Sequence, residues 1–445
     1  MAERQMFKAR LFTPRSLTMC AAALVIACGL IVLTAGRSSH RLFAQAPPQS
    51  TPDGRFAARL LQNRYPLAVR GGQFSGAGAP VLQAAIAQSR FVLLGEYHGV
   101  TQTPAFWTAV CRAAAPEGFQ TMAVEEGPLA AAELEDWAKR PDGLAQFLAF
   151  KKRFPDSINV SNAREEFDML QQCARAGGTD FRLWGLNQEM FGAAGLMLSR
   201  VLASHIGNDA RTAMQQLLDK ANDADRKAVQ SGRVFNLYMM AADDKELASG
   251  ASVLQKDGSP EARSLFASLI ESHEINRTSP AEYANARRRE RLMKTLFAAN
   301  YARAARAAAT PKVLLKFGAL HVYRGLNPVH GSGIGNYVSE WAEGQGAQSL
   351  HIYLLPVKGS QPIHPRVRQP AELRPFNLAE QPGFRYLQPI FSNLLGSDWT
   401  MFDLRPLRLD VNAPGGAINP DLATLVFGFD ILVVVPDSTP VTEIS

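Results

Sequence analysis

Five short apolar runs alternate with stretches of helical periodicity, and this alternation limits the fold more than any other feature of the chain. The runs are RFVLLGE (90–96), TMAVEE (121–126), FRLWGL (181–186), KVLLKFGALH (312–321) and LHIYLLPV (350–357). Helical spacing of apolar residues falls between them, over Val81 to Gln88, Pro104 to Ala115, Pro128 to Lys139, Ala163 to Ala176 and Gln188 to Ser204. Apolar strands separated by amphipathic helices indicate a mostly parallel sheet with helices on both faces. The sequence therefore predicts an α/β fold.

Residues 205–308 show no strand pattern and are rich in residues at helical spacing, so we expect a large helical insertion that covers one edge of the sheet. It ends in a long helix that contains the basic cluster Arg287 to Arg291, which we interpret as a solvated helix face. Residues 358–398 carry many prolines and are expected to be irregular. Two further short strands are predicted in WTMFDLRPL (399–407) and FDILVVVP (429–436).

The N-terminal region has the pattern of an export signal. A basic stretch precedes Leu17 to Ala35, which is uncharged and overwhelmingly apolar. This run is longer than the ~7–15 residues of a usual signal core and approaches the ~20 that span a bilayer. Residues 1–46 are therefore a signal peptide, cleaved after Ala46, or a membrane anchor, and we expect a protein of the periplasm or one held on the inner membrane and facing the periplasm. Residues 47–80, rich in Pro, Gly and Gln, are predicted to be a flexible linker to a domain over 81–445.

The charge distribution argues against a nucleic-acid partner. The 445-residue chain has a formal charge of +7, but residues 1–46 hold six Lys and Arg against one Glu, which leaves +2 for the rest. A nearly neutral body gives no electrostatic footprint for nucleic acid. We expect a small-molecule substrate, with membrane contact only through an uncleaved N-terminal segment.

The positions of the cysteines and the absence of common catalytic motifs exclude several classes of site. Cys20 and Cys28 lie in the leader, so Cys111 and Cys173 alone remain for the domain. Both lie in apolar helical stretches, which favours two buried free thiols over a disulfide. No CxxC pair is present, which excludes a zinc site built on cysteines. A Walker-type phosphate loop and a GxSxG elbow are also absent.

Polar residues follow four of the apolar runs. They are Glu96 and His98 after the first, Glu125 and Glu126 after the second, Asn187 and Glu189 after the third, and His321 after the fourth. Because the ligand crevice of an open parallel sheet lies outside the carboxyl ends of its strands, these side chains are predicted to meet in one crevice. In an extended chain Glu96 and His98 share a face and Tyr97 takes the other. By the same rule only one of Glu125 and Glu126 can join the crevice, and spacing does not choose between them.

The residue types in this crevice permit two chemistries. A neutral imidazole beside a carboxylate can take a proton from water near neutral pH, and the carboxylate raises the pKa of the imidazole. Two histidines and two carboxylates are also a ligand set for zinc, manganese or iron. These residue types do not distinguish water activation by His98 from metal-assisted hydrolysis.

Four motifs, LLGEYHG, GFQTMAVEEGP, LWGLNQEM and KFGALHVYRG, resemble the successive motifs of the erythromycin esterase-like group. Its wider superfamily includes the ChaN haem-binding lipoproteins and the TraB/Tiki metal-dependent peptidases, and the resemblance covers roughly residues 81–357. It implies an α/β fold and a hydrolase in which His98 is the general base, Glu96 or Glu125 orients it, and His321 polarises the carbonyl or stabilises the oxyanion. The neighbouring motif residues are then candidates for substrate binding, namely Tyr97, Asn187, Glu189, Tyr323 and Arg324.

Two departures from the family pattern limit what the resemblance implies. The esterases place their first Glu and His three apart, whereas Glu96 and His98 are two apart, as in ChaN-like proteins. The third motif usually has Asp where this chain has Asn187, so macrolide specificity does not transfer. Three alternatives remain: a haem-binding protein with Tyr97 and His98 as ligands, a metal-dependent peptidase, and a structural remnant of the site. Accordingly, the protein uses no cofactor, a divalent metal or haem. The large insertion favours a hydrolase with an enclosed small-molecule pocket.

Overall fold

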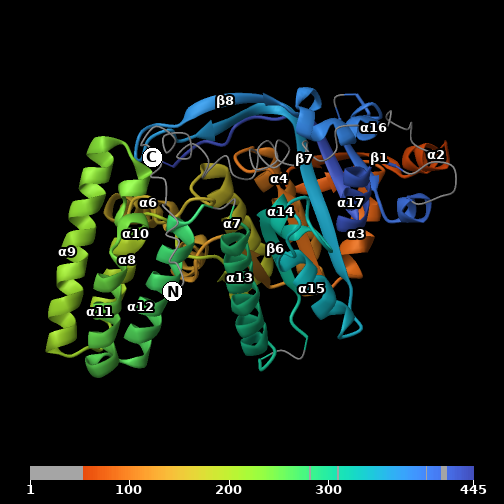
Figure 1. Cartoon of the computed structure of the whole chain (residues 1–445). Coiled ribbons are helices and arrows are strands. Elements are labelled where there is room, and N and C mark those ends of the chain that lie inside the picture. The colour runs from red at the N-terminus through yellow and green to blue at the C-terminus, as the bar shows by residue number, and fades with distance from the viewer. Residues whose placement is uncertain (1–53, 280–281, 308–309, 397, 412–417, 445) are drawn as a thin grey trace, which may run out of the picture.

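One mixed β-sheet organises the computed structural model, which describes residues 54–279, 282–307, 310–396, 398–411 and 418–444 (Figure 1). Six of its strands are parallel: β3 (Phe91–Glu96), β4 (Thr121–Val124), β5 (Arg182–Gly185), β6 (Val313–Gly318), β7 (Ser349–Ile363) and β10 (Ile431–Asp437). Four are antiparallel to their neighbours: β1 (Arg64–Arg70), β2 (Gln73–Ser75), β8 (Glu372–Asn377) and β9 (Trp399–Asp403). In the described residues the strand order is β2-β1-β9-β10-β7-β3-β6-β4-β5, with β8 beside β7.

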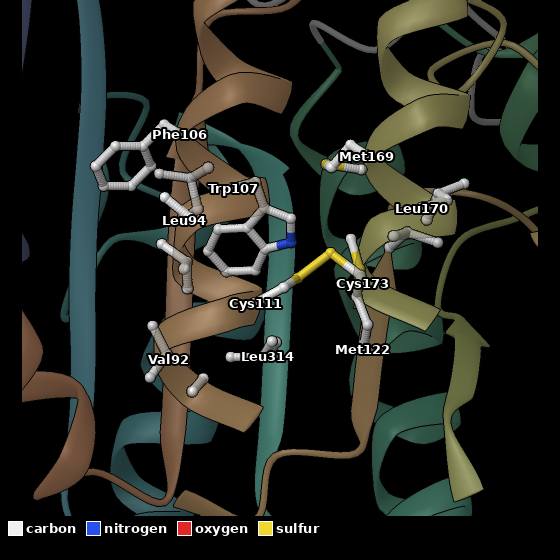
Figure 2. Packing of buried hydrophobic residues seen from close by; sticks show 14 of the residues in the cluster. Val92, Leu94, Phe106, Trp107, Cys111, Met122, Met169, Leu170, Cys173 and Leu314 are labelled. Carbon is white, nitrogen blue, oxygen red and sulfur yellow. A yellow bond between two sulfur atoms is a disulfide. The ribbon is translucent and has the colours of Figure 1, made fainter. Parts of the chain in front are cut away.

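The predicted α/β fold is confirmed, and every predicted apolar run forms a strand of this sheet. Phe91, Val92, Leu93 and Leu94 are all fully buried, because helices cover both faces. One face carries α3 (Gly78–Ala87), α4 (Gln102–Ala114), α5 (Pro128–Ala138), α6 (Gly143–Arg153) and α7 (Arg164–Gly177). The other carries α2 (Gly54–Gln62), α13 (Tyr283–Ala304), α14 (Ala319–Val322), α15 (Ile334–Glu343), α16 (Gln388–Phe391) and α17 (Pro420–Gly428). Figure 2 shows the first core, where Val92 and Leu94 of β3 face Trp107 of α4.

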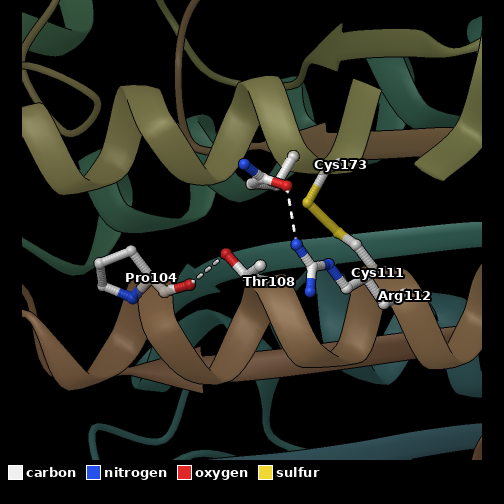
Figure 3. The surroundings of a disulfide bond; sticks show 6 residues. Pro104, Thr108, Cys111, Arg112 and Cys173 are labelled. Atoms are coloured by element: carbon white, nitrogen blue, oxygen red, sulfur yellow. Dashed lines mark hydrogen bonds between the residues drawn. A yellow bond between two sulfur atoms is a disulfide. The ribbon is translucent and has the colours of Figure 1, made fainter. Parts of the chain in front are cut away.

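Cys111 of α4 and Cys173 of α7 form a disulfide, so the interpretation as two free thiols is wrong (Figure 3). The two helices pack side by side on one face of the sheet, and their Cα atoms lie 5.2 Å apart at these positions, within the usual range for a disulfide. A second contact joins the same helices, since Arg112 Nη2 donates to Gln172 Oε1 over 2.9 Å. Helical periodicity shows that each cysteine is buried but not which helices are neighbours.

The insertion is helical as predicted and has a core of its own, but it begins before residue 205 and ends before the long helix α13 rather than with it. It comprises α8 (Ala194–Ala203), α9 (Asn208–Ser231), α10 (Tyr238–Ala241), α11 (Asp244–Asp257) and α12 (Pro260–Arg277), which stand as a bundle at one end of the molecule in Figure 1. The long helix α13 then returns to the sheet, where Met293, Phe297 and Tyr301 join the second core. No helix among the described residues is long and apolar enough to cross a membrane. The predicted leader over 1–46 lies outside the described residues.

Two segments expected to lack regular structure are folded. Residues 54–80 are not a linker, because β1 pairs with β9 and Leu67 of β1 lies in the first core. The glycines that suggested flexibility serve the turn between β1 and β2, where Gly71 and Gly72 have positive φ values of 58° and 71°. Within 358–398, β7 continues to Ile363 and pairs with β8, so this proline-rich segment is in part a two-stranded ribbon.

Candidate active site

The strand order brings the predicted site residues together. β6 lies between β3 and β4, so the segments that follow these three strands meet at one edge of the sheet. Glu96 ends β3, Glu125 follows β4, and His321 lies in the short helix α14 that follows β6. We call Glu96, His98, Glu125 and His321 the carboxylate–histidine cluster.

His98 lies between two carboxylates. Its Nδ1 is 3.1 Å from Glu96 Oε1, and its Nε2 is 3.6 Å from Glu125 Oε2. Glu96 is almost fully buried, whereas the His98 side chain is 23 % exposed. The predicted alternation is confirmed, because Tyr97 points to the opposite face and packs on Phe376 at a ring distance of 4.9 Å.

Glu125 is the glutamate that joins the cluster. Its Oε2 accepts a hydrogen bond from the Gly318 amide over 2.7 Å, and its Oε1 lies 3.4 Å from His321 Nε2. Glu126 points to the other face, where its Oε1 accepts from the Ser161 amide over 2.7 Å. Burial raises the pKa of Glu126 to about 7, whereas the pKa of Glu125 lies well below its ordinary value because His321 and Arg289 outweigh the effect of burial.

Arg289 and Glu290 of α13 complete the cluster, and the sequence reading missed both. Arg289 Nη2 donates to Glu125 Oε1 over 2.6 Å, and its Nη1 lies 3.2 Å from His321 Nε2. Glu290 Oε1 lies 2.5 Å from His321 Nδ1. Burial alone would lower the pKa of His321, but Glu290 and Glu125 outweigh it and raise this pKa to about 10. The interpretation of residues 287–291 as a solvated face is therefore wrong for these two positions.

Lys316 and Glu166 form a second layer beneath His98, and the sequence reading missed these as well. Lys316 Nζ lies 2.8 Å from Glu96 Oε2 and 2.9 Å from Glu166 Oε2, and all three side chains are buried. Burial alone would raise the pKa of Glu96, but Lys316 and His98 bring it to about 2. The available signal was a lysine inside an otherwise apolar strand, because a buried charge requires a partner.

Asn187 lies in the site, and Glu189 lies next to it in a different role. Asn187 Oδ1 accepts from Arg289 Nε over 3.0 Å, so this side chain orients the guanidinium. Glu189 Oε1 accepts from the Leu129 amide over 2.6 Å at the start of α5. Burial raises the pKa of Glu189 to about 7. The carboxylate lies where a side chain on Gly127 would have to be, so it stabilises the start of that helix rather than facing the crevice.

Tyr97, Tyr323 and Arg324, the other predicted substrate-binding residues, are not among the residues that line the two cavities beside the cluster. Tyr323 is buried in the second core with its ring 4.6 Å from Phe429. Arg324 pairs with Asp430, its Nη2 lying 2.9 Å from Oδ2. The chain turns after His321, so the residues that follow it in the motif leave the edge of the sheet.

Two cavities meet at Arg289. The smaller, of about 150 Å³, is lined by His98, Glu125, Asn187 and Arg289 and by the C-terminal residues Val441 and Glu443. The larger, of about 1170 Å³, lies along α13 and is lined by Arg289, Glu290 and His321 among others. The C-terminal segment covers the smaller cavity, since the Val441 amide donates to Gly99 O over 3.1 Å.

The carboxylate–histidine cluster fits a metal ion or haem poorly. The Arg289 guanidinium contacts both Glu125 Oε1 and His321 Nε2, at 2.6 and 3.2 Å, and so takes the place beside them that an ion bound to both would need. His98 presents different nitrogens to Glu96 and Glu125, so the two carboxylates and the imidazole do not converge on one point. Tyr97 and His98 point to opposite faces and do not form a pair of haem ligands.

Elsewhere in the described residues, Asp244, His273 and Glu274 have ligand atoms within 4.8 Å of one another. Arg277 already bonds both carboxylates, at 3.2 Å from Asp244 and 2.8 Å from Glu274. This group is therefore an ion-pair network between α11 and α12, in which Arg277 compensates the negative charge of the two carboxylates.

Three solved structures share this fold over most of both chains. The erythromycin esterase EreC, in an open conformation of a histidine-to-asparagine mutant, is 16% identical with a TM-score of 0.56, covering 82% of this chain and 95% of EreC. A Bacillus cereus protein is 15% identical with a TM-score of 0.53, covering 87% and 98%. A succinoglycan biosynthesis protein is 13% identical with a TM-score of 0.53, covering 88% and 98%.

Neither protein-family models nor curated proteins match the chain. The likeness to known proteins is therefore one of fold. This chain has the same fold as the erythromycin esterase EreC and the two other solved structures.

Proposed function

We propose that the chain is an exported hydrolase that cleaves an ester, lactone or amide bond of a small molecule with water activated by His98. The observation that carries this proposal is the position of His98, with Nδ1 on Glu96 and Nε2 toward Glu125 beside the smaller cavity. A carboxylate can only accept, so the Nδ1 that lies 3.1 Å from Glu96 holds the proton, whereas Nε2 at 3.6 Å from Glu125 is beyond hydrogen-bond distance of that carboxylate and is the basic nitrogen. An imidazole held in this way can take a proton from a water molecule as the water attacks a carbonyl carbon.

The charges around His98 suit the later steps of such a reaction. The imidazolium formed by proton transfer is stabilised by Glu96 and by Glu125, which is 3.6 Å from Nε2. The negative charge that develops on the carbonyl oxygen requires donors. Arg289 lines the smaller cavity and its Nη1 lies 3.2 Å from His321 Nε2, so these two cations are the candidates. Since the pKa of His321 is raised to about 10, this residue stays protonated at neutral pH. His98 then returns its proton to the leaving group, and the tetrahedral intermediate collapses.

The disulfide and the leader support export. A Cys111–Cys173 bond is stable in an oxidising compartment such as the periplasm. The apolar run Leu17 to Ala35 has the composition of a signal. N-terminal sequencing of the chain recovered from the periplasm of a bacterial host tests this part: a start at Pro47 supports export with cleavage, and retention in the cytoplasm contradicts it.

The catalytic part is tested by replacing His98 with Gln and assaying a panel of aryl esters, lactones and anilides. We expect kcat/KM to fall by about a hundredfold to ten-thousandfold, the usual contribution of a general base. The melting temperature should stay within a few degrees, because the imidazole is partly exposed. His205→Gln is the matched control, since His205 is exposed and far from the cluster in the fold. Hydrolysis that survives in His98→Gln would contradict the proposal.

A further inference from the structure

The larger cavity adjoins the catalytic cluster and is big enough for most of a substrate. Its volume of about 1170 Å³ exceeds the ~300–1,000 Å³ of usual small-molecule sites. Its walls come from the end of α12, from α13, from the loop over 326–332 and from α15. Met190 and Arg289 line both cavities, so the larger cavity adjoins the smaller one, where His98 lies.

A stripe of basic side chains on α13 faces this cavity. Arg287, Arg291 and Lys294 all line it, at the spacing that places them on one face of a helix. None of the three lies within ion-pair distance of a carboxylate in the part of the chain that the structure describes. Lys294 Nζ donates to Ser332 O over 2.6 Å, and the Arg287 guanidinium lies 5.7 Å from the ring centroid of Tyr283. Neither a carbonyl oxygen nor an aromatic ring carries a net negative charge, so the positive charges of Lys294 and Arg287 are not neutralised by these contacts.

The neighbouring charges show that this imbalance belongs to the cavity and not to α13 as a whole. Arg288 is bonded by Glu271 over 2.9 and 2.6 Å. That carboxylate reaches Arg291 only at longer range. Among the described lining residues Glu290 is the single carboxylate, and it is engaged by His321 and the Ile334 amide. Like charges one turn apart destabilise a helix, so the stripe has a cost that an anionic ligand would offset.

Apolar side chains form a large part of the remaining wall, beside uncharged polar ones such as Gln188, Asn276 and Asn327. Met190, Ile275, Leu320, Val329 and Tyr337 contribute to the wall. Leu326 and Tyr283 are 58% and 60% exposed at its rim. A ligand that matches these surfaces has an apolar portion together with a negatively charged group, and an amine-bearing molecule would be repelled.

We propose that the larger cavity selects an amphiphilic small-molecule substrate with an anionic group, a carboxylate, sulfate or phosphate, which is bound by Arg287, Arg291 and Lys294. This inference rests on the proposed function, because it treats the cavity as the substrate site. The scissile carbonyl then lies toward Arg289 and His98, and the anionic group lies along α13. The stripe therefore sets specificity and takes no part in the proton transfers.

Two fluorescent probes with the same aromatic skeleton test the charge requirement without hydrolysis. 1-Anilinonaphthalene-8-sulfonate carries a sulfonate that N-phenyl-1-naphthylamine lacks. We expect the sulfonate to tighten binding to the purified chain by about tenfold at low ionic strength, and this preference to shrink as salt screens the stripe. Equal affinities for the two probes would overturn the inference.

Charge variants locate the preference. A triple variant, Arg287→Gln, Arg291→Gln and Lys294→Gln, should lose the sulfonate preference and keep its affinity for the uncharged probe. The matched control removes the same net charge from exposed positions elsewhere, Lys152→Gln, Lys256→Gln and Arg303→Gln. This control should bind both probes like the wild-type chain, and an equal loss in the control would also overturn the inference.

Ester hydrolysis separates the two proposals. The His98→Gln variant should bind both probes normally, since His98 does not line the larger cavity. A chain that prefers the sulfonate but hydrolyses no ester would contradict the proposed function alone. A chain that hydrolyses neutral esters and shows no sulfonate preference would contradict this inference alone.

Discussion

Lys316 Nζ lies 2.8 Å from Glu96 Oε2 in the interior below His98. The same ammonium lies 2.9 Å from Glu166 Oε2, so one cation is shared by two buried carboxylates. The pair fixes Glu96, and Glu96 in turn fixes the imidazole of His98 through Nδ1. The orientation of the proposed base therefore depends on a buried charge network in the core of the sheet.

Lys316→Met should destabilise the fold strongly. It removes the cation and leaves Glu96 and Glu166 buried without a partner, which costs about 3–5 kcal/mol for a broken buried pair. Urea denaturation followed by circular dichroism measures the free energy of unfolding. Lys358→Met is the control, because the Lys358–Asp437 pair is 55% and 73% exposed and should contribute at most about 1 kcal/mol. Similar losses in both variants would show that the network contributes little.

The stability of the chain should fall as the pH rises from about 5 to about 8, in part through Glu189. Burial raises the pKa of Glu189 to about 7 from 4.5, so in this range the folded chain holds a proton that the unfolded chain releases. Protonated Glu189 makes its full contribution to the free energy of unfolding below pH 4.5, its pKa in the unfolded chain. This contribution, roughly 3 kcal/mol, is lost as the pH rises past the pKa of Glu189 in the folded chain.

Glu189→Gln should reduce this slope, since Gln resembles the protonated carboxyl and does not titrate. The free energy of unfolding, measured by urea at several pH values, should fall less with pH in the variant than in the wild type. Some slope remains, because burial also raises the pKa values of Glu126 and Glu166 to about 7. The exposed Glu117→Gln provides the control. An unchanged slope in Glu189→Gln would mean that this carboxylate is ionised in the fold.

Glu125→Gln and Glu126→Gln should separate the two adjacent glutamates. Glu125 contacts Arg289 and His321, so its loss disturbs both cations and should lower kcat/KM at least tenfold. Glu126 bonds Ser161 on the other face, and its replacement should leave turnover within about twofold. Equal effects on turnover would mean that the assignment of Glu125 to the site is wrong.

The sequence was sufficient for the features that depend on periodicity. Continuous apolar runs predicted β3, β4, β5, β6 and β7, since strands buried on both faces need apolar residues at every position. Alternation placed Glu96 and His98 on one face with Tyr97 on the other. The rule for strand ends then predicted that His321 and one of Glu125 and Glu126 would meet them.

Features that depend on which elements are neighbours could not be predicted in this way. Arg289 reaches Glu125 across 164 residues of sequence, and nothing in the spacing of a basic helix tells which of its side chains faces the sheet. The pairing of Cys111 with Cys173 depends on the packing of α4 against α7. The positions of Tyr323 and Arg324 depend on a turn after α14, which a motif of adjacent letters does not reveal.

The disulfide should contribute substantially to stability. It closes a loop with a sequence separation of 62 residues, for which the chain-entropy model gives about 4 kcal/mol. The double variant Cys111→Ala and Cys173→Ala should lose about this amount in urea denaturation. A reducing agent should lower the stability of the wild type toward that of the variant and leave the variant unchanged. A wild type that is insensitive to the reductant under unfolding conditions would contradict the bond.

Hydrolysis should survive the removal of divalent metals. Lys316 neutralises Glu96, and Arg289 binds Glu125 beside His321, so cations of the chain itself already compensate the carboxylates that a metal would need. Dialysis against a strong chelator should leave kcat/KM within about twofold, and added zinc or manganese should not raise it. Elemental analysis of the same samples is the control, because it shows whether the chelator removed any metal. If the chelator removes one metal ion per chain together with the activity, and the same metal restores it, the cluster would be assigned to metal-assisted hydrolysis, with Arg289 displaced from the site.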